Sequence, residues 1–173
     1  MPISLHATLV PGWLRLLEAG RGWLDKAEAF AGERDIPEAE LLDARLIGDM
    51  HPFTYQVKSM AVHSAGAIEG VRAGVFRPDN SEPPASFAAL RERLEGAAAL
   101  IGELTANETE SWIGLPMVFE TSRKRLSFAA EDFLLAFSQC NFHFHATTAY
   151  GILRMRGVPL GKLDYLGRLP VRG

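Results

Sequence analysis

The sequence predicts an all-α protein that folds as an antiparallel four-helix bundle, with a small β-hairpin between its third and fourth long helices. Two observations lead to this class. Four long segments repeat apolar residues every three or four positions, which is the period of an amphipathic helix. Between the last two of these segments, two short apolar runs flank a polar tetrapeptide, which is typical of a hairpin.

The first long helix is expected over residues 9–34, where large apolar side chains line one face and charged side chains the other. Pro11 fits this helix without strain only in its first turn, because proline has no N–H to donate inside a helix. A short acidic helix or helical turn is expected next, over residues 38–46.

The second long helix is expected over residues 52–73, because Pro52 suits a first helical turn and Gly74 suits a stop. Its apolar face is broad and includes many small residues. Residues 76–86 hold three prolines and several polar turn formers. We therefore expect a loop there that crosses between elements.

The third long helix is expected over residues 87–104, with the Ser86 hydroxyl as its N-cap. The hairpin follows, with strands at residues 115–120 and 125–128. Residues 129–156 then carry the longest helical pattern of the chain. This last helix holds most of the polar residues that could take part in chemistry.

The chain is expected to form a single domain over residues 1–173, since 173 residues suffice for one hydrophobic core. Residues 158–173 are expected to form a C-terminal strap that lies over the bundle. The apolar side chains expected to dock this strap are Leu160, Leu163, Tyr165, Leu166 and Leu169.

Composition excludes several classes of protein. The formal net charge is −3 and no basic stripe occurs, so nucleic acid is not an expected partner. Cys140 is the single cysteine, which excludes an intramolecular disulfide and a cysteine-rich zinc site and fits the reducing cytoplasm. No apolar run reaches the roughly 20 residues of a membrane span, so we expect no membrane association.

The strongest cluster of polar residues lies on the fourth helix. Asn141 and His145 are four positions apart and therefore share one helical face. His143 lies roughly 200° around the helix from His145, so it is expected at the surface or at a subunit contact. Cys140 has no adjacent base, which predicts a buried and inert thiol.

A second stripe, on the predicted second helix, faces this pair. Gln56, Met60 and His63 share one side of that helix and are expected to point toward Asn141 and His145. Two interpretations stay open. The residues form a buried hydrogen-bond network, or they hold a water or a weakly bound cation.

Other polar residues point to structural roles. Asp49 and His51 precede the second helix, where Asp49 is expected to cap amide groups. His6 is expected to be exposed near the N-terminus. No Glu-x-x-His, His-Glu-x-x-His, Gly-x-Gly-x-x-Gly or Walker A motif occurs, which excludes the diiron carboxylate bundle, the corresponding metalloproteases and the common nucleotide-binding loops.

The order of elements and the segment 141–157 resemble the DinB/YfiT-like metalloenzyme superfamily, whose last bundle helix carries a histidine followed by Leu-Arg and then Gly. Here these positions are His145, Leu153-Arg154 and Gly157. Within the superfamily the chain resembles an uncharacterised bacterial branch, a domain of unknown function. The residues that carry this second resemblance are Asp49-Met50, Gln56, Glu131-Asp132, the segment 141–150 and the segment 161–167.

The resemblance implies a DinB-like bundle and a position for a metal. In metal-binding members, one histidine from the second helix and an i, i+4 pair from the fourth hold a divalent ion such as zinc or nickel, and some members are thiol-dependent S-transferases. The matching positions here are Gln56, Asn141 and His145. Only His145 remains as an imidazole ligand, and His63 is a further nitrogen donor nearby.

Two functions therefore stay open. The first is a dimeric protein that binds a small-molecule ligand or a partner and keeps a degenerate metal site at Gln56, Asn141, His145 and His63. The second is a divalent-metal-dependent thiol S-transferase or hydrolase that uses His145. A homodimer is expected in both cases, with aromatic residues such as Phe142 and Tyr150 at the contact.

Overall fold

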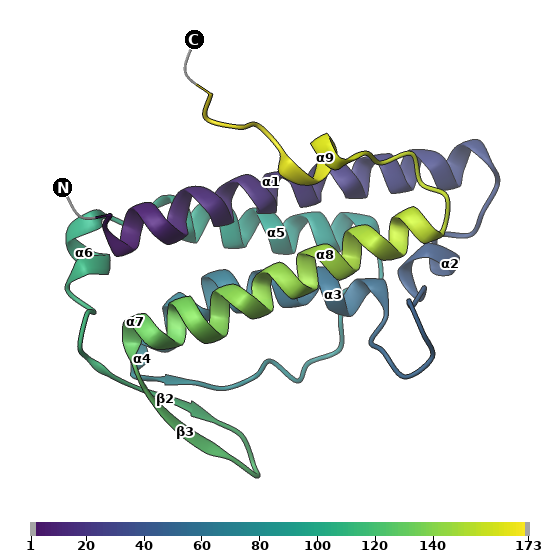
Figure 1. Ribbon diagram of the computed structural model, residues 1–173. Helices are drawn as coiled ribbons and strands as arrows, with labels where there is room; N and C mark the ends of the chain where they lie inside the picture. Colours follow the sequence, from purple (N-terminus) through teal and green to yellow (C-terminus); the bar gives the residue numbers. More distant parts are fainter. Residues whose placement is uncertain (1–2, 172–173) are drawn as a thin grey trace.

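The computed structural model describes residues 3–171, so the ends of the predicted domain and strap, residues 1–2 and 172–173, lie outside the described residues. The described chain is mostly helical, with a small three-stranded sheet (Figure 1). Its long helical segments are α1 (Leu5–Glu33), then α3 (Phe53–Ala61) with η1 (Val62–Gly66) and α4 (Ala67–Ala73), then α5 (Phe87–Gly102), then α7 (Ala130–Asp132) with η2 (Phe133–Ser138) and α8 (Gln139–Met155). The shorter elements are α2 (Glu38–Leu42), α6 (Ala106–Glu110), α9 (Lys162–Leu166), β1 (Val75–Phe76), β2 (Pro116–Glu120) and β3 (Arg125–Ala129).

Helix α1 begins earlier than its apolar pattern predicts. The Ser4 hydroxyl accepts a hydrogen bond from the Ala7 amide at 3.1 Å, and this cap starts the helix at Leu5. Pro11 consequently lies inside the helix instead of in its first turn. The other predicted signals act as expected, since Ser86 caps α5 and Gly74 ends α4 with a φ of 70°.

Antiparallel packing, which the sequence predicts, is present in two pairs of neighbouring helices. In the first pair, His6 Nε2 lies 3.1 Å from the Leu104 carbonyl oxygen, and Arg91 contacts Asp25 at 2.7 Å further along α1, so α1 and α5 run in opposite directions. In the second pair, α3 and α8 also run in opposite directions (Figure 1).

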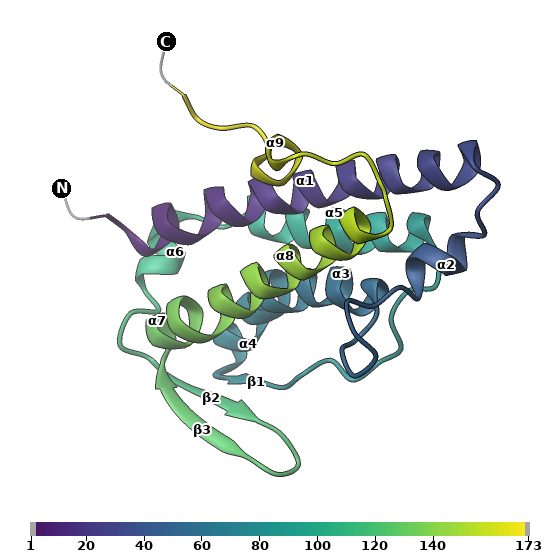
Figure 2. The same cartoon turned by 45° about the vertical axis from the view of Figure 1, so that its right-hand side comes forward.

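The other two neighbouring pairs run in the same direction. Trp13 packs on Phe142 and Trp23 packs on Tyr150, with ring centroids 6.2 and 6.0 Å apart, which makes α1 and α8 parallel. The loop after β1 runs back along α3 before α5 begins, so α3 and α5 are parallel too (Figures 1 and 2). The long proline-rich loop makes this arrangement possible, and the helices do not alternate strictly.

The predicted hairpin is present and is joined by a strand that the sequence did not reveal. β2 and β3 are antiparallel, with Val118 opposite Ser127, and β1 adds in parallel with Val75 opposite Val118. β1 has two residues, too few for an alternating pattern to show. The sheet places Phe76 and Phe119 beside the second and fourth helical segments.

The core holds large aromatic residues at the centre of the helical layers. Phe142, expected at a subunit contact, is 0% exposed and packs on Trp13, so that expectation is wrong for this residue. Tyr150 is half-buried between Trp23 and Tyr165. Each such ring contributes about 1.5–3 kcal/mol by leaving water. No helix within residues 3–171 is both long and apolar enough to cross a membrane.

The C-terminal strap docks through α9 on α1. Tyr165 stacks on Trp23 with ring centroids 5.6 Å apart, and the Trp23 indole N–H donates to the Asp164 carbonyl at 2.9 Å. Lys26 pairs with the Asp164 carboxylate at 2.6 Å. Leu163 and Leu169, which were expected to dock, are 76% and 42% exposed. Leu160 is 3% exposed and docks as expected, and Leu166 is half-buried. Part of the predicted apolar stripe therefore holds the strap, together with the aromatic stack and the polar contacts.

Gly70 allows α4 and β1 to lie close together, and its replacement is expected to be destabilising. A Cβ atom at Gly70 would lie 2.9 Å from Phe76 Cβ and 3.2 Å from its Cα. We expect Gly70→Ala to lower the free energy of unfolding by about 1–3 kcal/mol, because this overlap outweighs the better helix propensity of alanine. Chemical denaturation measures the change.

Gly96 in α5 is the matched control for Gly70. A Cβ there would meet no atom within 4 Å, so Gly96→Ala is expected to stabilise the protein by about 0.5–1 kcal/mol. If both variants changed the free energy of unfolding in the same direction, this result would contradict the close approach at Gly70.

Candidate functional site

The structure brings the predicted site residues together between the second and fourth helical segments. His63, Asn141 and His145 line a cavity of about 220 Å³, which we call the histidine cavity. Gln56 lies behind its wall, 2% exposed and bonded to His145. The rings that line the histidine cavity belong to Tyr55, His63, Phe76, Phe119, Phe137 and His145.

Gln56 orients His145 and does not line the cavity itself. The Gln56 amide N–H donates to the His51 carbonyl at 3.0 Å, which turns its oxygen toward His145. That oxygen lies 2.7 Å from His145 Nδ1, so Nδ1 carries the proton and donates. The lone pair of the neutral ring is therefore on Nε2. The position that the resemblance assigned to a metal ligand is occupied by a residue that holds the imidazole in place.

His63 enters the histidine cavity from the π-helical segment η1. Its ring is nearly parallel to that of His145, with centroids 5.6 Å apart and planes at 15°. The Ser138 hydroxyl, at the end of η2, donates to the His63 carbonyl at 3.1 Å. π-Helical turns are frequent at functional sites. Met60, expected on the same stripe, instead lies fully buried near Gly20 of α1.

Both histidines of the cavity are neutral at neutral pH. Burial lowers the pKa of His145 to about 4, with a smaller contribution from repulsion by His51. Burial also lowers the pKa of His63 to about 3, and repulsion by His145 adds to this effect. Each ring therefore offers a ring nitrogen with a free lone pair, either to a ligand or to a proton in transfer.

Asn141 presents an acceptor to the histidine cavity. Its amide N–H donates to the Phe137 carbonyl at 2.8 Å, one turn earlier in the chain. Within residues 3–171, no donor bonds to its Oδ1 atom. Asn141 and His145, which are predicted to share one face of the fourth helix, line the same cavity.

Lys58 anchors the loop that closes the cavity, and the sequence analysis missed it. This lysine is 2% exposed, and its ammonium donates to the carbonyl oxygens of Asp79 and Ser81 at 2.9 and 2.5 Å. It also pairs with the Asp79 carboxylate at 3.1 Å. The available signal was a lysine among the apolar positions of the predicted second helix. The anchored loop supplies Pro78 and Asp79 to the cavity wall.

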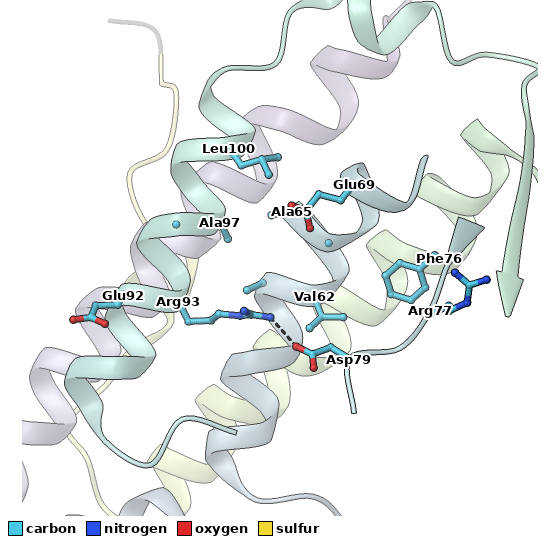
Figure 3. A pocket seen from close by; sticks show the side chains of 13 residues that line it. Val62, Ala65, Glu69, Phe76, Arg77, Asp79, Glu92, Arg93, Ala97 and Leu100 are labelled. Atoms are coloured by element: carbon cyan, nitrogen blue, oxygen red, sulfur yellow. Dashed lines mark hydrogen bonds and ion pairs between the residues drawn. The ribbon is translucent and has the colours of Figure 1, made fainter. Parts of the chain in front are cut away.

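Asp79 is ionised and fully engaged. Partial burial raises the pKa of this carboxyl, but hydrogen bonds from Ser81 and the nearby Lys58 ammonium lower it more, to about 2. Arg93 of α5 donates to its second oxygen at 2.8 Å, as the dashed line in Figure 3 shows. The carboxylate is therefore held from both sides.

A larger cavity adjoins the histidine cavity. It has a volume of about 460 Å³ and lies between α5 and the second helical segment (Figure 3). Val62, Phe76 and Asp79 line both cavities and thus form the wall between them. Small residues make up much of its helical surface, and Glu69, Glu92, Arg77 and Arg93 supply its charges.

The residues of the histidine cavity do not fit the three-histidine metal site that the resemblance implies. They offer two imidazoles and the neutral amide oxygen of Asn141, and the one carboxylate of the lining, that of Asp79, is already paired with Lys58 and Arg93. Zinc sites normally use nitrogen and sulfur ligands with carboxylate oxygens, so this set is weak for zinc. In the described part of the chain, no group of three or more His, Cys, Asp or Glu side chains is placed to hold a metal ion.

Several single-residue expectations are corrected. Cys140 is exposed, not buried, because it lies on the outer side of α8. Asp49 does not cap the second helix, since the helix starting at Phe53 has no side-chain cap. His6 is half-buried and contacts the Leu104 carbonyl. His143 is not corrected in this way, because it is half-buried and lies outside the histidine cavity; burial lowers its pKa, with a further contribution from Arg15.

Comparison with known proteins identifies the family. The family model described as "Domain of unknown function (DUF1993)" matches residues 5–166. No curated protein matches the chain. The fold is similar to a crystal structure of a DinB family member protein from Shewanella denitrificans, with 27% sequence identity, a TM-score of 0.80 and coverage of 98% of this chain and 95% of the other. The chain therefore belongs to the DUF1993 family, a branch of the DinB-like superfamily whose function is unknown.

Proposed function

We propose that this protein is a DinB-type four-helix bundle that binds a small organic molecule in the histidine cavity, which is a degenerate form of the superfamily's metal site. The observation that carries the proposal is the cavity itself. Aromatic and imidazole rings make up much of its lining, and Gln56 holds the neutral imidazole of His145 there with its Nε2 lone pair free. Concave sites with mostly apolar walls and a few fixed polar atoms are typical of small-molecule binding.

The cavity suits an organic ligand better than an ion. Two of the three positions that bind metal in related proteins hold the neutral amides Gln56 and Asn141. Both amide groups make hydrogen bonds within the protein, to His51 and Phe137 respectively. Their role is thus to fix the shape and polarity of the cavity.

A divalent-metal-dependent thiol S-transferase or hydrolase that uses His145 is the second candidate. One observation favours it. The Gln56 oxygen accepts a hydrogen bond from His145 Nδ1, and such an acceptor behind the ring is the usual way to orient a histidine that binds a metal. Zinc or nickel would then bind at Nε2, with His63 as a further donor.

Metal analysis and ligand titration of the same untagged protein separate the two candidates. We expect less than a tenth of an equivalent of zinc or nickel after dialysis, roughly the background of a site without three strong ligands. We expect small aromatic fragments to shift the amide NMR signals of the cavity residues. Ser59→Leu adds volume to the cavity wall and should abolish these shifts.

The matched control and the contrary result are both clear. Ala99→Leu places the same side chain on an exposed position of α5 and should leave fragment binding intact. About one equivalent of bound zinc or nickel, lost in His145→Ala, would favour the metal-dependent candidate instead.

Homodimerisation and a cytoplasmic location complete the proposal. The ring available for a contact between subunits is Phe144, which is 55% exposed on α8, since Phe142 is buried in the core. Partner binding through this face is compatible with ligand binding, because His145 points into the histidine cavity from another side of the same helix.

A further inference from the structure

The walls of the histidine cavity limit its ligand to a small ring-bearing molecule. A volume of about 220 Å³ is below the range usual for drug-sized ligands, so it accommodates one ring with a short substituent. The Phe119 and Phe137 ring centroids lie 4.9 Å apart, and those of His63 and Phe137 lie 5.9 Å apart, so these three rings form one connected part of the wall. Such walls bind rings by stacking and also attract cations to their faces.

Besides the Ser59 and Tyr55 hydroxyls, which can donate or accept, the cavity presents two polar atoms that can only accept. His145 must present the Nε2 lone pair, because its Nδ1 proton is used by Gln56. Asn141 must present Oδ1, because its N–H is used by the Phe137 carbonyl. A ligand whose polar group only accepts hydrogen bonds would leave both atoms without partners, at about 1–3 kcal/mol each. The ligand must therefore bring N–H or O–H donors.

The charges around the cavity disfavour an anion. Among the residues described, Asp79 is the only charged side chain in its lining, and no lysine or arginine lines it. Lys58 is not part of the lining. Its ammonium binds the carbonyl oxygens of Asp79 and Ser81 and the Asp79 carboxylate, so it has no donor left for a ligand. The Arg93 partner of Asp79 lies on the side of the larger cavity. A carboxylate or phosphate would find no cation to bind.

We propose that the ligand of the histidine cavity is a small aromatic amine that binds as its ammonium ion. The ammonium supplies three donors to a site that presents the acceptors Asn141 Oδ1 and His145 Nε2, and its positive charge lies against aromatic faces. This inference rests on the proposed ligand-binding function and specifies the chemical class of the ligand.

Three probes of nearly equal shape test the class. Benzylamine carries an ammonium, benzyl alcohol a neutral donor and benzoate an anion. We expect benzylamine to bind at least about tenfold more tightly than benzyl alcohol, measured as dissociation constants from NMR titration at neutral pH, and benzoate not to bind. Ser59→Leu should abolish the binding of every probe and so place it in the cavity.

Two substitutions of Asn141 test whether the ammonium group of the ligand determines its binding. Asn141→Leu removes the acceptor and should weaken benzylamine about tenfold or more. Asn141→Asp adds a carboxylate at the same place and should tighten benzylamine while leaving benzyl alcohol nearly unchanged. The second variant retains a polar side chain, so the test holds even if Asn141→Leu does not fold.

The outcomes distinguish this inference from the proposed function. Equal or tighter binding of benzyl alcohol or benzoate overturns the amine and leaves ligand binding in place. No binding by any of the three probes overturns both. If Ser59→Leu leaves the binding of benzylamine unchanged, benzylamine binds outside the histidine cavity and the inference is overturned.

Discussion

Replacing Lys58 with methionine is expected to lower the free energy of unfolding by about 3–5 kcal/mol, the largest loss predicted for a single polar residue of this protein. Lys58 is 2% exposed, and methionine retains the length of the apolar stem. What disappears is the ammonium. The carbonyl oxygens of Asp79 and Ser81 then lose their donor, and the Asp79 carboxylate loses its buried partner.

The loss should also reach the histidine cavity. Lys58 fixes the loop that supplies Pro78 and Asp79 to the cavity wall, so a released loop opens the site. We expect Lys58→Met to weaken any cavity ligand in addition to destabilising the fold. Urea denaturation measures the first effect and NMR titration the second.

Arg93→Met is the control for Lys58→Met, because Arg93 binds the same carboxylate from the exposed side. Its side chain is 45% exposed, whereas that of Lys58 is 2% exposed. An exposed ion pair contributes about 0–1 kcal/mol, so this variant should remain close to the parent protein. If both variants lose a similar amount of unfolding free energy, the burial of Lys58 does not explain its contribution to stability.

Acidification is expected to begin to destabilise the protein near pH 6.5, which is above the pH range in which carboxylates titrate. The pKa values of His145 and His63 are lowered in the folded protein from the ordinary 6.5 to about 4 and about 3. Below pH 6.5 the unfolded chain takes up protons at these two residues and the folded protein does not. The contribution to stability is therefore complete above pH 6.5 and falls as the pH decreases toward 4 and 3.

The expected size of the pH effect is up to about 2 kcal/mol from each histidine between neutral pH and about pH 5. Urea denaturation at several pH values measures it. The double variant His63→Gln/His145→Gln keeps polar side chains in the cavity but removes both titrating groups. Its stability should change less with pH than that of the parent, and an unchanged slope would contradict neutral histidines in the cavity.

Much of the local structure could be predicted from particular residues. The Ser86 cap, the Gly74 stop and the hairpin all follow from short-range chemistry that a single segment carries. The common face of Asn141 and His145 follows from helical periodicity. These features need no knowledge of how distant segments pack.

The remaining features depend on tertiary contacts that a pattern does not contain. Whether α5 runs parallel to α3 depends on the path of the loop after β1, and many paths fit the same composition. The π-helical segments η1 and η2 leave no periodic signal, yet η1 carries His63 into the cavity. The position of Lys58 among apolar residues hints at burial, but its partners Asp79 and Ser81 come from a loop whose path the pattern does not contain.

The position of Cys140 gives the protein a natural attachment point for a reporter group. It is the single cysteine of the sequence, it is exposed, and it immediately precedes Asn141 in the chain. A thiol-reactive fluorophore would therefore attach at one place only, on the helix that carries Asn141 and His145 of the histidine cavity. Ligand binding in the unsubstituted protein can thus be followed by fluorescence at low concentration, without introducing or removing any cysteine.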